Sequence, residues 1–195
     1  MKEASVRAVF LDRDGVITVP EFRDGWSFAP RSLAEFKMYP ETQDCLQRLY
    51  KAGFIIVVVT NQPDVGHGHV RRDVVEAIHA YILEALPVAS IECCYHRQDE
   101  GCACRKPSPG MIFGAAERYG IDLRKSVMVG DRESDVEAGR SAGCHTVFID
   151  RGYSEPPPRH AGAVVNSLAE ATEYILALAM KMGTADHVPS ECLKR

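Results

Sequence analysis

Short apolar runs rich in β-branched residues recur along the chain, and each is followed by a polar loop. They predict strands at 6–11, 54–60, 91–95, 126–129 and 146–149. Between them, apolar residues at helical spacing predict helices that end at Gly53, cover 74–86, and cover 112–119 before Gly120. Because continuous apolar strands alternate with helices, we expect a doubly wound parallel α/β sheet covered on both faces.

The chain of 195 residues fits one domain, which we place at 1–183, followed by a polar tail at 184–195. Ser167 and Glu170 resemble a capping box that opens a last helix reaching about Met182. Between Gly15 and Pro40 there is room for a flap but not for a separate cap domain. The catalytic face is therefore expected to be open.

Composition narrows the classes of partner. A net charge of −4 with interspersed signs gives no support for nucleic-acid or anionic-membrane binding. The first apolar run is too short for a signal peptide or a membrane span, so a cytoplasmic monomer acting on a small molecule is expected. Seven cysteines, an odd number, argue against a disulfide framework and for metal or redox use where they cluster.

The most informative polar positions follow the first predicted strand, in the sequence Phe-Leu-Asp-Arg-Asp-Gly. Side chains of an extended segment alternate faces, so Asp12 and Asp14 leave the strand on the same side. Gly15 permits a sharp turn after them. Asp12 is a candidate nucleophile that carries a phosphoryl group, and Asp14 a candidate acid and base. Like charge between the two favours a protonated Asp14.

Two later loops offer groups that bind anions. Thr60, Asn61 and Gln62 follow the second strand with a hydroxyl, amides and backbone donors. Lys106 can neutralise charge on a phosphoryl group, and Arg105 can bind another substrate group through two hydrogen bonds.

A carboxylate for a cation follows the fourth strand. Gly130 turns the chain there and leaves Asp131 free to hold a metal ion. Mg²⁺ prefers few protein carboxylates together with water and phosphate, so Asp12, the Asp14 carbonyl and Asp131 form the predicted site. Asp135, one helical turn further, is expected to orient the site.

Each motif has an ordinary structural alternative, such as an acidic turn after a strand, a polar strand end or a solvated basic turn. A calcium loop is a further alternative for Asp12–Gly15, but there the glycine comes later and a glutamate closes the loop. Carboxyl ends of parallel strands lie at one edge of a sheet, so four such motifs in order favour a single site for phosphoryl transfer.

The order Asp-x-Asp-Gly-Val, Thr-Asn, Lys-Pro and Gly-Asp-x-x-x-Asp resembles the haloacid dehalogenase (HAD) superfamily of aspartate-dependent phosphatases, from Val6 to about Leu178. The resemblance implies a Rossmann-like domain. It also implies that Asp12 is the nucleophile, Asp14 the acid and base, and Asp131 the magnesium ligand. Thr60 and Lys106 are then the residues that stabilise the phosphoryl group.

A second cluster combines three thiols and an imidazole within eleven residues: Cys94, His96, Cys102 and Cys104. This is a Cys₃His pattern for tetrahedral zinc, with closer spacing than in most zinc fingers, and four incidental loop residues are the alternative. A closed site of four ligands is structural, so zinc is expected to hold a short loop and to take no part in the chemistry.

The string from Cys94 to Met111 resembles one subgroup of that superfamily, the heptose-1,7-bisphosphate 7-phosphatases and the related histidinol-phosphate phosphatases. The ending Arg-Lys-Pro-x-Pro-Gly-Met is closer to the heptose enzymes and favours a sugar bisphosphate as substrate. The resemblance implies substrate contacts from Arg105 and Arg132, and we expect further substrate contacts from Arg13, Asn61 and Gln62. Where those enzymes continue Ser-Gly-Ile-Ala-Arg-Gly after Gln62, this chain has Pro63–Gly68 with His67 in place of the arginine.

Two alternatives stay open. A histidinol-phosphate phosphatase would offer the same loops a cationic amine in place of a second phosphate. A signalling receiver domain also combines a doubly wound sheet, magnesium and a phosphorylated aspartate, although an Asp14 placed to activate water argues against a long-lived phosphoaspartate.

Overall fold

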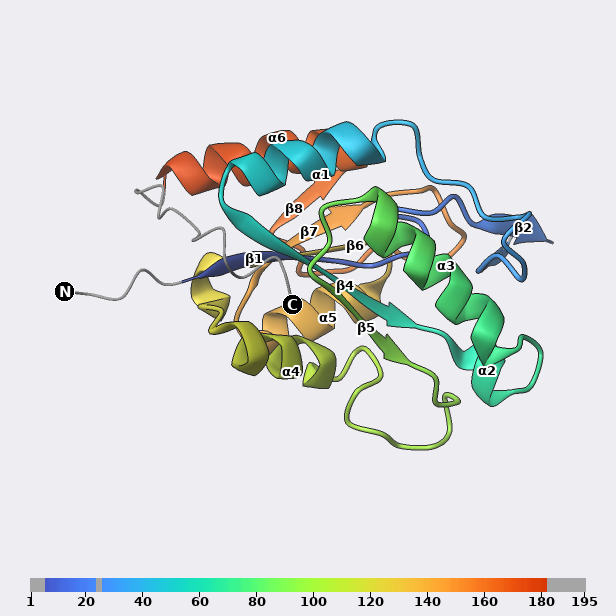
Figure 1. Cartoon of the computed structure of the whole chain (residues 1–195). Helices are drawn as coiled ribbons and strands as arrows, with labels where there is room; N and C mark the ends of the chain where they lie inside the picture. Colours follow the sequence, from blue (N-terminus) through green and yellow to red (C-terminus); the bar gives the residue numbers. More distant parts are fainter. Residues whose placement is uncertain (1–5, 24–25, 182–195) are drawn as a thin grey trace.

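A computed structural model of the chain describes residues 6–23 and 26–181. Its centre is a parallel sheet in the order β5-β4-β1-β6-β7-β8 (Figure 1). The strands of this sheet are β1 (Arg7–Leu11), β4 (Phe54–Asn61), β5 (Ser90–Cys94), β6 (Val127–Gly130), β7 (His145–Ile149) and β8 (Ala163–Val165). The predicted parallel α/β fold is confirmed, and β8 is an additional edge strand too short to give an apolar run.

Helices cover both faces of the sheet. On one face lie α1 (Thr42–Lys51), α3 (Arg72–Ala85) and α6 (Leu168–Lys181), and on the other lie α4 (Gly110–Tyr119) and α5 (Glu133–Ala142), as Figure 1 shows. Side chains of β1 alternate between the two cores: Val9 and Leu11 pack with α1 and α6, whereas Ala8 and Phe10 pack with α4 and α5. Both faces of β1 are therefore buried.

Short elements join the strands and helices. The segment expected to form a flap contains an antiparallel hairpin of β2 (Glu21–Arg23) and β3 (Trp26–Phe28). A single turn, α2 (Pro63–Gly66), follows β4, and the 3₁₀ turn η1 (Leu123–Lys125) precedes β6. No helix in the described part of the chain is both long and apolar enough to cross a bilayer.

The start of α6 departs in one detail from the expected capping box. The Ser167 Oγ accepts from the Glu170 N–H at 3.1 Å, as expected. The Glu170 carboxylate accepts from the N–H of Asn166 at 3.0 Å instead of from that of Ser167. The expected tail at 184–195 lies outside the described residues.

Candidate active site

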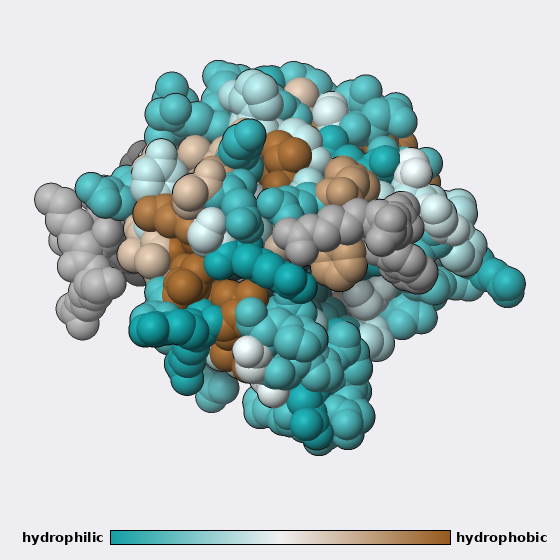
Figure 2. Space-filling view, turned by 90° about the vertical axis from the view of Figure 1, so that its right-hand side faces the viewer, coloured by the Kyte–Doolittle hydropathy of each residue, from teal (hydrophilic) through white to brown (hydrophobic). Residues whose placement is uncertain are grey.

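The predicted chemical groups converge where the central strands end. Asp12 follows β1, Asp131 follows β6, and the Asp12 N–H donates to the Val129 carbonyl at 2.9 Å, which holds these two loops side by side. Both loops lie at the face viewed in Figure 2, where hydrophilic side chains predominate. A cavity of about 790 Å³ opens there, and its lining includes Asp12, Asp14, Asn61, Gln62, Arg105, Lys106 and Arg132.

Lys106 is the electrostatic centre of the cavity floor. Its Nζ lies 2.7 Å from Asp12 Oδ1 and 2.7 Å from Asp135 Oδ1, and it donates to the Val59 carbonyl at 2.7 Å. Burial disfavours the charged amine, but the two carboxylates outweigh it and raise the pKa of Lys106. For Asp12, burial is the larger effect and raises the pKa to about 6, although the charge of Lys106 acts to lower it.

Asp131 completes a cluster of three carboxylates. Its Oδ2 accepts from the Tyr153 hydroxyl at 2.6 Å, while its buried Oδ1 has no hydrogen-bond partner among the described residues. Burial, reinforced by Asp12 and Asp135, raises the pKa of Asp131 well above its usual range. Gly15 permits the close approach of its loop, since its φ is +89° and a Cβ there would lie 1.8 Å from Asp131 Oδ2.

The cluster fits a divalent cation. One carboxylate oxygen from each of Asp12, Asp131 and Asp135 lies within 4.8 Å of the other two. Lys106 supplies one positive charge to three buried carboxyl groups, and a bound divalent cation would favour the ionised form of all three. Asp135 has both oxygens engaged, by Lys106 and by the Arg132 N–H at 3.0 Å, as expected for a residue that orients the site. The unpartnered Oδ1 of Asp131 is the open ligand atom.

We expect Tyr153→Phe to weaken Mg²⁺ binding about tenfold, because a group that holds a metal ligand typically affects affinity by that much. The loss of one hydroxyl frees Asp131 Oδ2 and releases the orientation of Oδ1. Calorimetric titration of the resting protein with Mg²⁺ measures the effect. Tyr119→Phe is the matched control, since its hydroxyl donates to the Ala89 carbonyl at 3.4 Å and Tyr119 does not belong to the carboxylate cluster. Equal Mg²⁺ affinity in both variants would contradict the role given to Tyr153.

Asp14 is held by donors on both of its oxygens. The Nε and Nη2 atoms of Arg13 bind both oxygens, the shortest contact being 2.8 Å, and the Gln62 Nε2 donates to Oδ2 at 2.8 Å. Both oxygens of Asp14 therefore act as hydrogen-bond acceptors in this arrangement. Arg13 itself is fully buried and does not line the cavity. The role of Arg13 toward substrate therefore stays a prediction.

The two residues that end β4 have different surroundings. Asn61 binds the backbone of Lys106 at both sides: its Nδ2 donates to the carbonyl at 3.0 Å, and its Oδ1 accepts from the N–H at 3.1 Å. Thr60 is buried, and its hydroxyl accepts from Gln62 Nε2 at 2.9 Å without lining the cavity. Asn61 thus positions Lys106, and the role of Thr60 toward a phosphoryl group stays a prediction.

Two arginines on the cavity wall suit an anionic substrate. Arg105 has a buried Nη1 that lacks a hydrogen-bond partner within the described ranges. Arg132 forms an ion pair with Glu155 and lies over the Tyr153 ring, 5.1 Å from its centroid. Arg105 is therefore the more available of the two for a second charged group of a substrate.

The cavity rim joins three segments that are distant in sequence. Arg31, after the hairpin, lies 3.6 Å from Asp64 on α2, and Asp64 also lies 3.6 Å from His69. His67 contacts Gln98 through Nε2 at 2.8 Å. Asp64 and Gln98 line the cavity. The altered sequence after Gln62 therefore connects the flap to the loop that follows β5.

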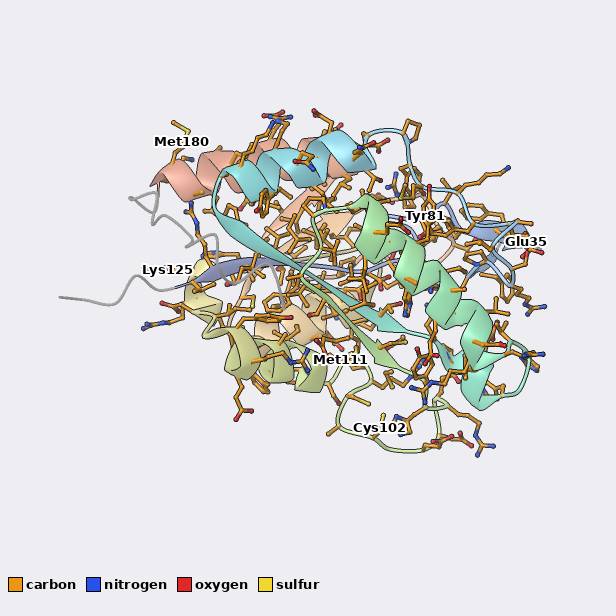
Figure 3. The ribbon with its side chains drawn as sticks, viewed as in Figure 1. Glu35, Tyr81, Cys102, Met111, Lys125 and Met180 are labelled. Atoms are coloured by element: carbon orange, nitrogen blue, oxygen red, sulfur yellow. The ribbon has the colours of Figure 1, made fainter. Side chains whose placement is uncertain are left out.

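The four predicted zinc ligands come together in the loop between β5 and α4. The Sγ–Sγ and Sγ–Nδ1 distances given for Cys94, His96, Cys102 and Cys104 lie between 3.3 and 3.6 Å. Two sulfurs bound to one zinc are about 3.8 Å apart, so these positions fit a tetrahedral site. Figure 3 shows Cys102 on the loop beyond β5, away from the helices that cover the sheet. Arg105 and Lys106 follow this cluster directly.

Cys102→Ala is expected to reduce the zinc content from about one ion per chain to near zero and to lower the unfolding temperature, because three ligands do not close the site. Elemental analysis and thermal unfolding measure both effects. Cys93→Ala is the matched control, since this thiol lies outside the cluster. Retention of zinc by the Cys102 variant would contradict the ligand set.

Comparison with known proteins gives consistent matches. A HAD-hydrolase-like family model matches residues 103–171. A D-glycero-beta-D-manno-heptose-1,7-bisphosphate 7-phosphatase of Pseudomonas aeruginosa is 37% identical over 149 residues, 74% of this chain and 81% of that protein. The corresponding alpha-heptose enzyme of Photorhabdus laumondii is 28% identical over 191 residues, 90% of this chain and 100% of that protein.

A solved structure is also similar. The D,D-heptose 1,7-bisphosphate phosphatase from B. bronchiseptica, complexed with magnesium and phosphate, aligns with a TM-score of 0.76 at 32% identity. The alignment covers 89% of this chain and all of that one. The similarity therefore extends over most of the fold.

Proposed function

The chain belongs to the HAD-like family of heptose-1,7-bisphosphate 7-phosphatases and is a phosphatase, and we propose that it removes the 7-phosphate of D-glycero-D-manno-heptose 1,7-bisphosphate through an aspartyl-phosphate on Asp12. One observation carries the proposal: Asp12 and Lys106 meet on the floor of a cavity whose wall carries Arg105 and Arg132, and a carboxylate oxygen of the buried Asp131 lies within 4.8 Å of one of Asp12. A nucleophile, a charge-stabilising cation and a second anion site are the parts that this reaction needs.

In the first step, an oxygen of Asp12 forms a bond to phosphorus as the bond between phosphorus and the sugar oxygen breaks. The bonding electrons stay with the sugar oxygen, which takes a proton from Asp14. Asp14 takes up this proton from solvent before the step and acts as the acid from the place that Arg13 and Gln62 give it. Lys106, 2.7 Å from Asp12, balances charge on the phosphoryl oxygens.

In the second step, water attacks the phosphorus of the aspartyl-phosphate, and the bond from phosphorus to Asp12 breaks. Asp14, now a carboxylate, takes one proton from the water. The products are inorganic phosphate and the original Asp12 carboxylate. The contacts that Asp14 makes with Arg13 and Gln62 fit this ionised form.

We assign the catalytic cation as Mg²⁺, held by Asp12, Asp131 Oδ1 and the Asp14 carbonyl. When bound, Mg²⁺ neutralises phosphoryl charge and fixes the angle at which phosphorus meets Asp12. Zn²⁺ is assigned to Cys94, His96, Cys102 and Cys104, where it keeps the loop that leads into Arg105 and Lys106 in place.

The substrate assignment rests on the wall of the cavity. Arg105 has a buried donor without a partner, which suits the 1-phosphate of a bisphosphate, and the volume of about 790 Å³ accommodates a seven-carbon sugar. The more similar of the two relatives named above is a beta-heptose enzyme. We therefore propose the beta anomer as the preferred substrate.

The proposal is tested by phosphate release with Mg²⁺ from the two anomers of heptose 1,7-bisphosphate, histidinol phosphate and fructose 1,6-bisphosphate. We expect the highest kcat/KM for the beta anomer. Higher activity on the alpha anomer would correct the anomer alone. The absence of release from either anomer would overturn the proposal.

Histidinol phosphate is the second candidate, because two carboxylates, those of Asp64 and Glu155, line the cavity and could bind an amine. Glu155 is paired with Arg132 and Asp64 with Arg31, so an amine would compete with existing cations. This competition favours the sugar bisphosphate. Activity on histidinol phosphate alone would reverse the order.

We also propose that the enzyme acts as a cytoplasmic monomer. The thiols of Cys45, Cys93 and Cys144 are unpaired, which fits a reducing compartment. All groups assigned to the reaction come from one chain, so a second copy is not needed to complete the site.

A further inference from the structure

The residue between the two catalytic aspartates has unusual surroundings. Arg13 is the largest fully buried side chain in the described ranges. Its Nε and Nη2 atoms bind Asp14, and its Nη1 lies 3.0 Å from the Nε2 of His79, a buried residue on α3. A buried guanidinium requires partners for its donors, so His79 and Asp14 together determine where Arg13 lies.

The contact fixes the chemical form of His79. Arginine only donates hydrogen bonds, so the imidazole Nε2 has to be the acceptor and Nδ1 carries the hydrogen. Burial, and then the charge of Arg13, lower the pKa of His79 to about 4, in agreement with a neutral ring. The His79 ring is thus a neutral acceptor at neutral pH.

We propose that His79 is a positioning residue for the phosphatase reaction. Its ring accepts a hydrogen bond from Arg13 Nη1, so that Nε and Nη2 of Arg13 point at Asp14 and set the position of the general acid and base. This rests on the proposed function, since it needs Asp14 in that role. His79 lies outside the lining of the cavity, so it acts through Arg13 and not on substrate.

The chain of contacts also couples a helix to the chemistry. His79 shares α3 with Ile78 and Ile82, which are fully buried in the core beside α1 and α6. The ring therefore has a fixed place relative to the sheet. A fixed ring fixes Arg13, and Arg13 then holds Asp14 between itself and Gln62. Without the acceptor, Nη1 would be a buried donor of a charged group with no partner.

The test compares His79→Leu, which removes the acceptor at similar volume, with His79→Gln, whose Oε1 can accept from Nη1. We expect His79→Leu to lower kcat on the sugar phosphate about tenfold with KM unchanged, and His79→Gln to recover most of kcat. Ile82→Val is the control for packing on the same helix, and it is expected to lower the unfolding temperature while kcat stays constant.

The choice of leaving group separates positioning from a general structural defect. The aryl oxygen of p-nitrophenyl phosphate leaves without a proton, so formation of the aspartyl-phosphate from this ester needs no acid. We expect the burst of nitrophenol in a rapid-quench experiment to have the same rate in His79→Leu and in the unchanged enzyme. The proposal would be overturned if His79→Leu lowered the burst rate on p-nitrophenyl phosphate as much as it lowers kcat on the sugar phosphate. It would also be overturned if kcat on the sugar phosphate did not change.

A measurement without turnover keeps the two proposals distinguishable. The Arg13 Nε–H resonance, assigned with Arg13→Lys, reports the hydrogen bond to Asp14 directly. We expect slow solvent exchange of this proton in the unchanged protein and in His79→Gln, and fast exchange in His79→Leu. Slow exchange in all three proteins would overturn the role of His79. If the exchange rates follow the expectation but the unchanged protein has no activity on the sugar phosphate, only the proposed function is overturned.

Discussion

Asp12→Asn is expected to lower kcat by about four orders of magnitude or more, because an amide does not form the phosphoryl intermediate. The fold should persist, since the asparagine has the same shape and Lys106 keeps contacts with Asp135 Oδ1 and the Val59 carbonyl. Phosphate release measures the loss. Zinc content and circular dichroism establish that the variant is otherwise intact.

The control is Asp73→Asn, an exposed carboxylate on α3 that pairs only with Arg71. It should leave kcat within the experimental error. Turnover by the Asp12 variant above about one per cent of the original rate would exclude Asp12 as nucleophile, because no other route of that efficiency is left in the proposed mechanism.

Lys106→Met is expected to have the second-largest effect, since it removes the cation between two buried carboxylates. Breaking such a buried pair lowers the free energy of unfolding of the metal-free protein by about 3–5 kcal/mol. The value of kcat should fall about a thousandfold, because the charge that stabilises the phosphoryl group is lost. The variant should gain more thermal stability from Mg²⁺ than the unchanged enzyme does, because the cluster then holds three uncompensated carboxylates.

Thermal unfolding with and without Mg²⁺, together with phosphate release, tests this expectation. Lys125→Met is the control: Figure 3 places this lysine at the end of the molecule opposite the flap and α2. An unfolding temperature equal to that of the unchanged protein in the absence of Mg²⁺ would show that Lys106 does not compensate the buried charge.

The sequence was most informative where one local pattern decides one feature. Apolar runs predicted five strands of the sheet, and the central strands β1, β4 and β6 are apolar at almost every position because they are buried on both faces. The cluster of Cys94, His96, Cys102 and Cys104 was likewise predicted from the spacing of these residues, and the structure brings the four side chains together.

Elements without such a pattern were missed. The helix α5 contains Gly139 and few large apolar residues, because its sheet-facing side packs so closely on β6 that a Cβ at Gly139 would lie 2.5 Å from the Met128 Cβ. An apolar stripe could not form there. The three residues of β8 complete the sheet edge through pairing with β7 and not through their own hydrophobicity.

In the site, sequence reasoning named the reacting groups but not the groups that hold them. Tyr153 and His79 lie far from Asp131 and Arg13 in sequence and belong to no motif. Arg13 was predicted to bind substrate, and no pattern in the sequence indicates that it is buried with His79 of α3 as a neighbour. Only the packing of distant segments shows which polar side chains support the reacting ones.

The central place of β1 in the sheet has a consequence for the order in which function appears during folding. The loop with Asp12 is held to that of Asp131 through pairing of β1 with β6, and the contact between the Ala8 N–H and Ser126 spans 118 residues. Contacts so distant in sequence form late. During synthesis, the growing chain would therefore contain its nucleophile as soon as the first strand is made. It would become catalytically active only after most of the polypeptide had left the ribosome.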